Sequence, residues 1–243
     1  MNNNTQITGK EFKKAEELQD FTHFIDCSFN GINLSGKKFE EPLKFEKCTF
    51  NECNLKKSSF SKPVFINCTL NETIFCTARI YEAEFTGCKM PSADFSGAKI
   101  NNSKFINCDL TNAIFAETIL FISSFIQCKL MGANFQDAQT TGFKMDESNC
   151  RYSNFRYISF QKQTLNGIDF SEADLTGCNF HGAVLNDCNL NDANLHNAVL
   201  TNADLSRSEI SGFDITNCKT LQGAIISAEQ ASQMLEPYGI RVV

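Results

Sequence analysis

The sequence of 243 residues contains no tryptophan, only four prolines and three histidines, and no Cys-x-x-Cys pair. With so few imidazoles and no paired cysteines, the chain has little material for a zinc site. No apolar run approaches the ~18 residues that a membrane-spanning helix requires. A net charge of −6 at pH 7 argues against direct nucleic-acid binding, because nucleic-acid-binding domains are usually basic. We therefore expect no metal, no cofactor, no membrane span and no direct nucleic-acid contact.

Twelve cysteines are nevertheless present. The first ten residues, MNNNTQITGK, are polar and lack the apolar centre of a secretory signal peptide. In a chain of this length without an export signal, cysteines usually stay reduced. We expect a cytoplasmic protein whose cysteines are inert thiols with a packing role.

A period of five residues runs through most of the chain. Every fifth position from Phe45 to Ile215 is Phe, Leu, Ile or Met in 33 of 35 cases, the exceptions being Thr140 and Cys150. The position two residues earlier is Ala, Cys, Ser or Thr in 28 of 35 cases. This period matches neither an α-helix nor a simple strand. It predicts a chain that turns inward once in five residues, with one large and one small side chain filling the interior.

Cysteines at the small position add a second period of 20 residues: Cys48, Cys68, Cys88, Cys108 and Cys128. Four pentapeptides in 20 residues predict a four-sided coil that stacks at the spacing of paired strands, about 4.8 Å. Phe24 precedes Phe45 by 21 residues, so one extra residue enters near Pro42. The register indicates roughly nine to ten coils over residues 21–220. Residues 1–20 are interpreted as a disordered start and an irregular first coil with a short helix.

Some of these pentapeptides match a known consensus. ADFSG (residues 93–97), ADLTG (173–177) and ADLSR (203–207) fit the A-(D/N)-L-x-x pattern of pentapeptide repeat proteins. Over residues 21–220 the chain resembles this family. The resemblance implies an all-β solenoid, a right-handed quadrilateral β-helix with four pentapeptides per coil. It implies little about activity, because one fold serves proteins of many roles.

Residues 221–243 leave the period of five and predict a short C-terminal helix. Ser227 and Gln230 form a capping box at its start, Pro237 ends it, and Gly239 suits the stop. The pattern L-Q-G, then Q-A-S, then L-x-x-x-G-I-x-V resembles the end of Qnr-type fluoroquinolone-resistance proteins. Near the start, FIDCSFNGINLSG also resembles their opening coils.

The Qnr and MfpA resemblance carries expectations about partners. In those proteins the terminal segment forms a two-fold dimer, and the rod mimics duplex DNA and binds DNA gyrase or topoisomerase IV. The unbroken register from 45 to 215 leaves no room for the projecting loops that many Qnr proteins carry. We expect a homodimer through the C-terminus. The residues expected to form it are Ala231, Met234, Leu235, Tyr238, Ile240 and Val242.

Acidic residues concentrate in the last third of the chain. Residues 1–162 contain 19 Lys/Arg and 18 Asp/Glu, a net of +1, whereas residues 163–243 contain 3 and 10, a net of −7. Such a field could engage a basic, DNA-binding partner. Alternatively, Asp is simply the preferred consensus residue and aids solubility. The candidate partner-binding acids are Asp169, Glu172, Asp174, Asp187, Asp192, Asp204, Glu209 and Asp214.

Apolar residues at outward positions suggest a second candidate surface. Ile66, Ile106 and Ile126 share one column of the predicted stack. The remaining candidates are expected on neighbouring faces of the same coils: Ile114, Phe121 and Ile122. An exposed apolar cluster can mark a partner site. The alternative is a scatter of surface apolar residues without a role.

Between Thr140 and Ile168 the pattern of large and small inward residues is disturbed. Phe143 replaces a small residue, while Thr140 and Cys150 replace large ones, and a bulky side chain can fill space lost opposite it. A bend or widening of the rod is expected there. A recognition site is a further hypothesis, because four large outward residues cluster in this region: Arg151, Tyr152, Arg156 and Tyr157.

The sequence contains no phosphate-binding loop, hydrolase elbow or metal motif. A rod with a filled interior also lacks the concave pocket that catalysis needs. We therefore expect a non-enzymatic protein-binding module. The first hypothesis is a DNA-mimicking protein that binds DNA gyrase or topoisomerase IV and modulates it or protects it from quinolones. The second is a structural scaffold that docks another protein through the apolar column.

Overall fold

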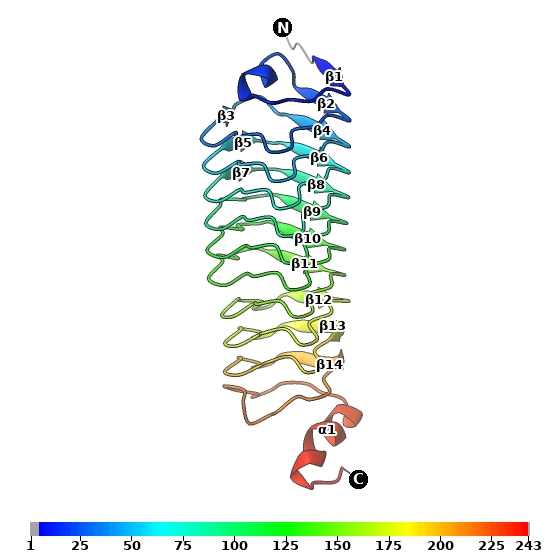
Figure 1. The fold of residues 1–243 in the computed structure, drawn as a ribbon. Helices are drawn as coiled ribbons and strands as arrows, with labels where there is room; N and C mark the ends of the chain where they lie inside the picture. The colour runs from blue at the N-terminus through cyan, green and yellow to red at the C-terminus, as the bar shows by residue number, and fades with distance from the viewer. Residues whose placement is uncertain (1–4, 243) are drawn as a thin grey trace.

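The chain folds into a rod of stacked coils with a helix at its C-terminal end (Figure 1). This computed structural model describes residues 5–242. None of the helices in that range is long and apolar enough to cross a membrane. The strands and the α-helix, with the 3-10 helices labelled η, are β1 (Gln6–Thr8), η1 (Ala15–Leu18), β2 (His23–Ile25), β3 (Lys38–Phe39), β4 (Lys44–Glu46), β5 (Ser59–Ser61), β6 (Val64–Ile66), β7 (Arg79–Tyr81), β8 (Glu84–Thr86), β9 (Lys104–Ile106), β10 (Ser124–Ile126), β11 (Lys144–Asp146), β12 (Thr164–Asn166), β13 (Val184–Asn189), β14 (Asp204–Glu209), α1 (Ala228–Leu235) and η2 (Glu236–Tyr238).

The strands pair in parallel, and their register follows the periods of the sequence. The largest sheet has the order β1-β2-β4-β6-β8-β9-β10-β11, and two smaller sheets have the orders β3-β5-β7 and β12-β13-β14. Phe65 pairs with Phe85 and Phe85 with Phe105, a step of 20 residues, whereas Phe24 pairs with Phe45 at a step of 21. The predicted solenoid of about ten coils, with its insertion near Pro42, is confirmed.

A residue in the left-handed region turns the chain at each corner of the coil. Asn102, Asn107 and Asn112 have φ of 54°, 53° and 56°. Asn and Gly tolerate this region better than other residues, which explains their frequency at the corners. The corner N–H then donates to a carbonyl of the next coil, as Asn107 does to Ile126 at 3.0 Å. Each coil therefore accepts hydrogen bonds from the corner N–H groups of the coil before it.

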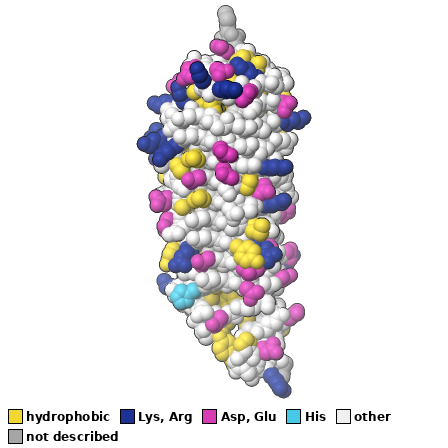
Figure 2. All heavy atoms as spheres, viewed as in Figure 1, with side chains coloured by type: hydrophobic (Ala, Val, Ile, Leu, Met, Phe, Trp, Pro, Cys, Tyr) yellow, Lys and Arg dark blue, Asp and Glu magenta, His cyan; other side chains and the backbone are white. Residues whose placement is uncertain are grey.

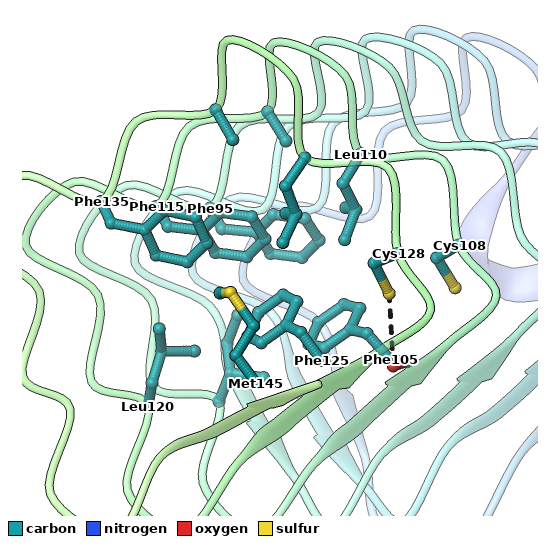
Figure 3. Close-up of a cluster of buried hydrophobic side chains, with 14 of the residues drawn as sticks. Phe95, Phe105, Cys108, Leu110, Phe115, Leu120, Phe125, Cys128, Phe135 and Met145 are labelled. Atoms are coloured by element: carbon teal, nitrogen blue, oxygen red, sulfur yellow. Dashed lines mark hydrogen bonds between the residues drawn. The ribbon is translucent and has the colours of Figure 1, made fainter. Parts of the chain in front are cut away.

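Stacked phenylalanine rings fill the interior (Figure 3). The ring of Phe105 lies nearly parallel to those of Phe85 and Phe125, with centroids 4.8 and 4.6 Å away. It meets Phe115 of a second stack edge-on at 6.0 Å. Burying one such side chain contributes about 1.5–3 kcal/mol. Since every coil repeats the arrangement, the rod is stabilised mainly by contacts between neighbouring coils.

The N-terminal segment covers the N-terminal end of the rod. Residues 1–4, part of the expected disordered start, lie outside the described residues. From Thr5 onward the chain forms an irregular first coil, in which β1 pairs with β2 and η1 supplies a single helical turn. The ring of Phe12 stacks on Phe29 at 4.8 Å and is buried, so this coil covers the first phenylalanines of the stack.

Candidate interaction surfaces

The predicted acids lie along the last coils, and half of them have a structural role in their own turns. Each carboxylate of that half accepts hydrogen bonds from the N–H and the hydroxyl of the residue two positions later. In Asp204 the bonds come from Ser206 at 3.0 and 2.7 Å. This turn chemistry explains why Asp precedes x-Ser or x-Thr so often in the repeat. The residues concerned are Asp169, Asp174, Asp204 and Asp214.

Three arginines neutralise part of the acidic segment. Arg151 binds Glu172 at 2.9 Å, and Arg156 binds Asp174 at 3.0 Å. The third pair joins Arg207 to Asp187 at 2.8 Å. Within residues 5–242, Asp169, Asp192, Asp204, Glu209 and Asp214 form no ion pair. Of the eight predicted acids, these five therefore carry charge that no ion pair compensates.

Hydrogen bonds favour the ionised form of two of the unpaired acids. A hydrogen bond from the Ser206 hydroxyl holds the pKa of Asp204 below its usual value. For Asp214 the pKa is lowered by the Thr216 hydroxyl and then by Tyr238. On the face shown in Figure 2, lysines and arginines gather nearer the N-terminal end, while acidic side chains continue toward the C-terminal end. The charge asymmetry predicted from the sequence is therefore a feature of the surface.

The predicted apolar column exists, but the structure does not gather all six apolar residues into one patch. Ile106 in β9 pairs with Ile126 in β10, and Ile66 lies two coils away in the same column. Ile126 is 36% exposed. Phe121 and Ile122 form an exposed corner just before β10. Ile114 lies on a different side of the coil, in a separate column of bridges.

The C-terminal helix α1 caps the open end of the rod (Figure 1). The predicted capping box is present, with Gln230 Oε1 accepting from Ser227 N–H at 2.6 Å and Ser227 Oγ accepting from Gln230 N–H at 3.1 Å. Gln230 is buried, and its Nε2 donates to the carbonyls of Leu205 at 2.7 Å and Ser208 at 2.5 Å. The helix thus satisfies carbonyls at the edge strand β14. The predicted stop is also present, with Pro237 in η2 and Gly239 at φ 72°.

One of the predicted dimerisation residues faces inward. Met234 is buried in the core of its own chain, so it is not available to a second copy. The periodicity of the helix showed an apolar face but not which neighbour covers it. Ala231 and Leu235 are half-buried, and the Tyr238 hydroxyl donates to Asp214 at 2.8 Å.

The exposed large apolar side chains of this end include three predicted residues, Tyr238, Ile240 and Val242, and one that was not predicted, Ile225. Ile225 bridges to Asp204 at the last coil. Sequence reasoning missed it because the period of five had already ended, although an apolar residue beside Ile226 in a polar stretch was a usable signal.

The coil with the disturbed core is where the stack opens on one side. β11 and β12 belong to different sheets and do not pair. In the described part of the chain, Gln139 bridges to Ile119 and Ser159 to Asn179, but no bridge joins Gln139 to Ser159. An open hollow of about 600 Å³ lies between the two coils. The gap lies where the sequence predicts a bend or widening of the rod, and it shows that two successive coils do not pair there.

Phe143 lies at the opening and lines the hollow. It occupies a position that is small in the coils above, and its ring centroid lies 5.5 Å from Phe125 and 6.2 Å from Phe135. Phe143 is buried, and Thr140 at a large position is half-buried. The exchange of large and small inward residues seen in the sequence therefore coincides with the place where the coils stop pairing.

The cysteine ladder serves packing and backbone hydrogen bonding. Cys128 Sγ donates to the carbonyl of Phe105 at 3.3 Å, as Figure 3 shows, and Cys108 donates to Phe85 in the same way. All twelve cysteines are free thiols, and ten of them are buried. Burial raises the pKa of Cys53, a buried thiol outside the ladder, to about 12, so this thiol is protonated at neutral pH. No group of three His, Cys, Asp or Glu side chains within residues 5–242 could hold a metal ion.

Comparisons with known proteins agree with this architecture. A family model described as "Pentapeptide repeat region" matches residues 41–105 and 98–173, and one described as "Pentapeptide repeats (8 copies)" matches residues 178–217. No curated protein sequence matches the chain.

Several solved structures have a similar fold. A trypsin-treated variant of QnrB1, a plasmid-mediated fluoroquinolone resistance protein, is 24% identical, with a TM-score of 0.59 over 89% of this chain and 99% of that one. HetL, involved in heterocyst differentiation regulation in the cyanobacterium Nostoc sp. strain PCC 7120, is 20% identical, with a TM-score of 0.59 over 82% of this chain and 87% of that one. At these identities the likeness concerns the fold. The family models cover more than half of the residues, and the chain therefore belongs to the pentapeptide repeat family.

Proposed function

We propose that this protein is a non-enzymatic, cytoplasmic binding module that presents an acidic rod to DNA gyrase or topoisomerase IV. The observation that carries the proposal is the net charge of −7 on residues 163–243, which form the last coils and the terminal helix. An enzyme that binds duplex DNA has a basic groove, and a negatively charged rod is steered toward such a groove. The shared fold of QnrB1, a fluoroquinolone resistance protein, supports this choice of partner.

A supercoiling assay with purified gyrase, with and without ciprofloxacin, tests the proposal. We expect micromolar protein to inhibit supercoiling or to restore it in the presence of the drug. The absence of both effects at that concentration would contradict the proposal.

Charge neutralisation tests the mechanism. Replacing four acids by Asn should weaken binding and flatten its salt dependence, because fewer charges attract the partner. The fold should survive, since the Asn Oδ1 can still accept the turn hydrogen bonds. The matched control is Asp94→Asn with Asp109→Asn, which alters the same turn in the less acidic part of the rod. The four test positions are Asp169, Asp174, Asp192 and Asp214.

We also propose that two copies join through their C-termini. Ile225, Ile240 and Val242 are exposed apolar residues at that end, and their contact would place two acidic segments together at the centre of a longer rod. Light scattering at tens of micromolar should give twice the chain mass of 27.2 kDa. A monomer at that concentration would count against the interface.

A second candidate function is a scaffold that docks another protein through the apolar column. Ile106 and Ile126 stack in adjacent strands, which favours this reading. Replacing both by Asp should abolish capture of a partner while circular dichroism stays unchanged. Asn102→Asp with Asn112→Asp, at exposed corners outside the column, is the matched control and should leave capture unchanged. Persistence of the partner on the double variant would rule the column out.

A further inference from the structure

Two tyrosines lie at corners of the rod within residues 140–168, where the pattern of large and small inward residues is disturbed. Tyr152 and Tyr157 have φ of 59° and 63°, in the left-handed region that disfavours bulky side chains. Among the described residues with positive φ they are the only aromatic ones. The equivalent corners of adjacent coils carry Gly132 and Gly177. The chain therefore retains a strained tyrosine twice within one coil, and such strain tends to persist at functional sites.

The first corner is held by an ion pair to the next coil. The guanidinium carbon of Arg151 lies 5.3 Å from the centroid of the Tyr152 ring, and Arg151 Nη2 is 2.9 Å from Glu172. The hydroxyl of Tyr152 accepts a hydrogen bond from the same Nη2 at 3.4 Å. The ion pair between Arg151 and Glu172, which has no net charge, thus holds Tyr152 in place.

The second corner repeats this arrangement. The guanidinium carbon of Arg156 lies 5.7 Å from the Tyr157 ring centroid, and the same guanidinium binds Asp174 at 3.0 Å. The ring also lies over Gly177, where a Cβ would come within 2.5 Å of Tyr157 Cδ1. A glycine in the next coil therefore makes room for the ring. Two corners with the same Arg, Tyr and carboxylate arrangement flank one side of a single coil.

Both rings remain accessible. Tyr152 is 53% exposed and Tyr157 is 65% exposed, the highest value for a large hydrophobic side chain in the described chain. Exposed Tyr beside Arg is the composition of protein-binding hot spots. Residues 163–243, which form the coils that follow toward the C-terminus, carry a net charge of −7. A lysine or arginine of a partner can stack on the open face of each ring while its other basic groups face the acids.

We infer that Tyr152 and Tyr157 anchor a basic, DNA-binding protein surface on this side of the rod. The acids of the last coils steer the partner, and the two rings supply short-range affinity. This inference rests on the proposed function and deepens it by naming the anchoring residues.

The test measures binding of purified gyrase to the Tyr152→Asn and Tyr157→Asn double variant. Asn102 and Asn112 already occupy corners with the same geometry, so the variant should fold. Relief of strain should raise the melting temperature by about 2–4 °C. The Kd for gyrase should rise about tenfold or more. The slope of affinity against salt should stay unchanged, because no charge is removed.

Thr77→Asn is the matched control. It relieves strain of the same kind at an exposed corner, where the β-branched Thr77 has φ 55°, and it belongs to neither candidate surface. It should stabilise the fold and leave the Kd within about twofold of wild type. An equal loss of binding in this variant would attribute the effect to the corner substitution itself and overturn the inference.

The remaining outcomes are equally decisive. A double variant that binds gyrase like wild type overturns the inference and leaves the proposed function intact. A lower melting temperature in that variant refutes the strain argument. Failure of the wild-type protein to bind gyrase overturns the proposed function, and the inference with it.

Discussion

Replacing Gln230 by Ala should release the terminal helix from the end of the rod. The side chain forms three hydrogen bonds, to the carbonyls of Leu205 and Ser208 and from the N–H of Ser227. Leaving a buried polar group without a partner costs about 1–3 kcal/mol. Water reaches part of this end, so we expect about 2–4 kcal/mol in total rather than the full sum. Because coils are stabilised by their neighbours, the loss should concentrate in the last coil and α1.

Hydrogen exchange monitored by mass spectrometry is the assay for this variant. A loss of 2–4 kcal/mol corresponds to roughly 30- to 1,000-fold faster exchange across residues 221–242. Gln233→Ala is the matched control, since Gln233 lies on the exposed side of the same helix. Unchanged exchange in Gln230→Ala, or equal acceleration in both variants, would refute the role assigned to the side chain.

Four further outcomes are expected. Phe105→Ala should lower the free energy of unfolding in urea by about 3–5 kcal/mol, because the ring is stacked on both sides. Four amides at the opening donate no backbone hydrogen bond to the other coil, those of Thr140, Gly142, Ser159 and Thr164. They should exchange with solvent faster than the equivalent amides one coil earlier. Hydrogen bonds lower the pKa of Asp204 and Asp214 in the folded state. The stability that these two carboxylates contribute to the fold is therefore complete above the ordinary pKa of 3.8 and is lost as the pH falls from there through the lowered pKa of the folded state. An acid titration followed by circular dichroism should show this loss. In native protein Ellman's reagent should react first with Cys76 and Cys218, the two thiols that are not fully buried.

Much of this fold follows from the sequence because its constraints are local and repeated. An inward position every five residues must be large and apolar, and a step of 20 residues brings equivalent positions together in parallel strands. The same logic located the insertion near Pro42. It also located the irregular coil near Thr140, since an exchange of large and small residues is visible without coordinates. The helix cap at Ser227 was predictable because its partners are only three residues apart.

The tertiary structure decided what depends on contacts between coils. Arg156 finds Asp174 at a separation of 18 residues, and Gln230 finds Leu205 at a separation of 25. Whether a carboxylate is free or paired, and whether Met234 faces its own core or a partner, depends on side-chain directions that a period of five does not encode. The periods determined which residues stack, and the packing of side chains from separate coils determined which of them remain available to a partner.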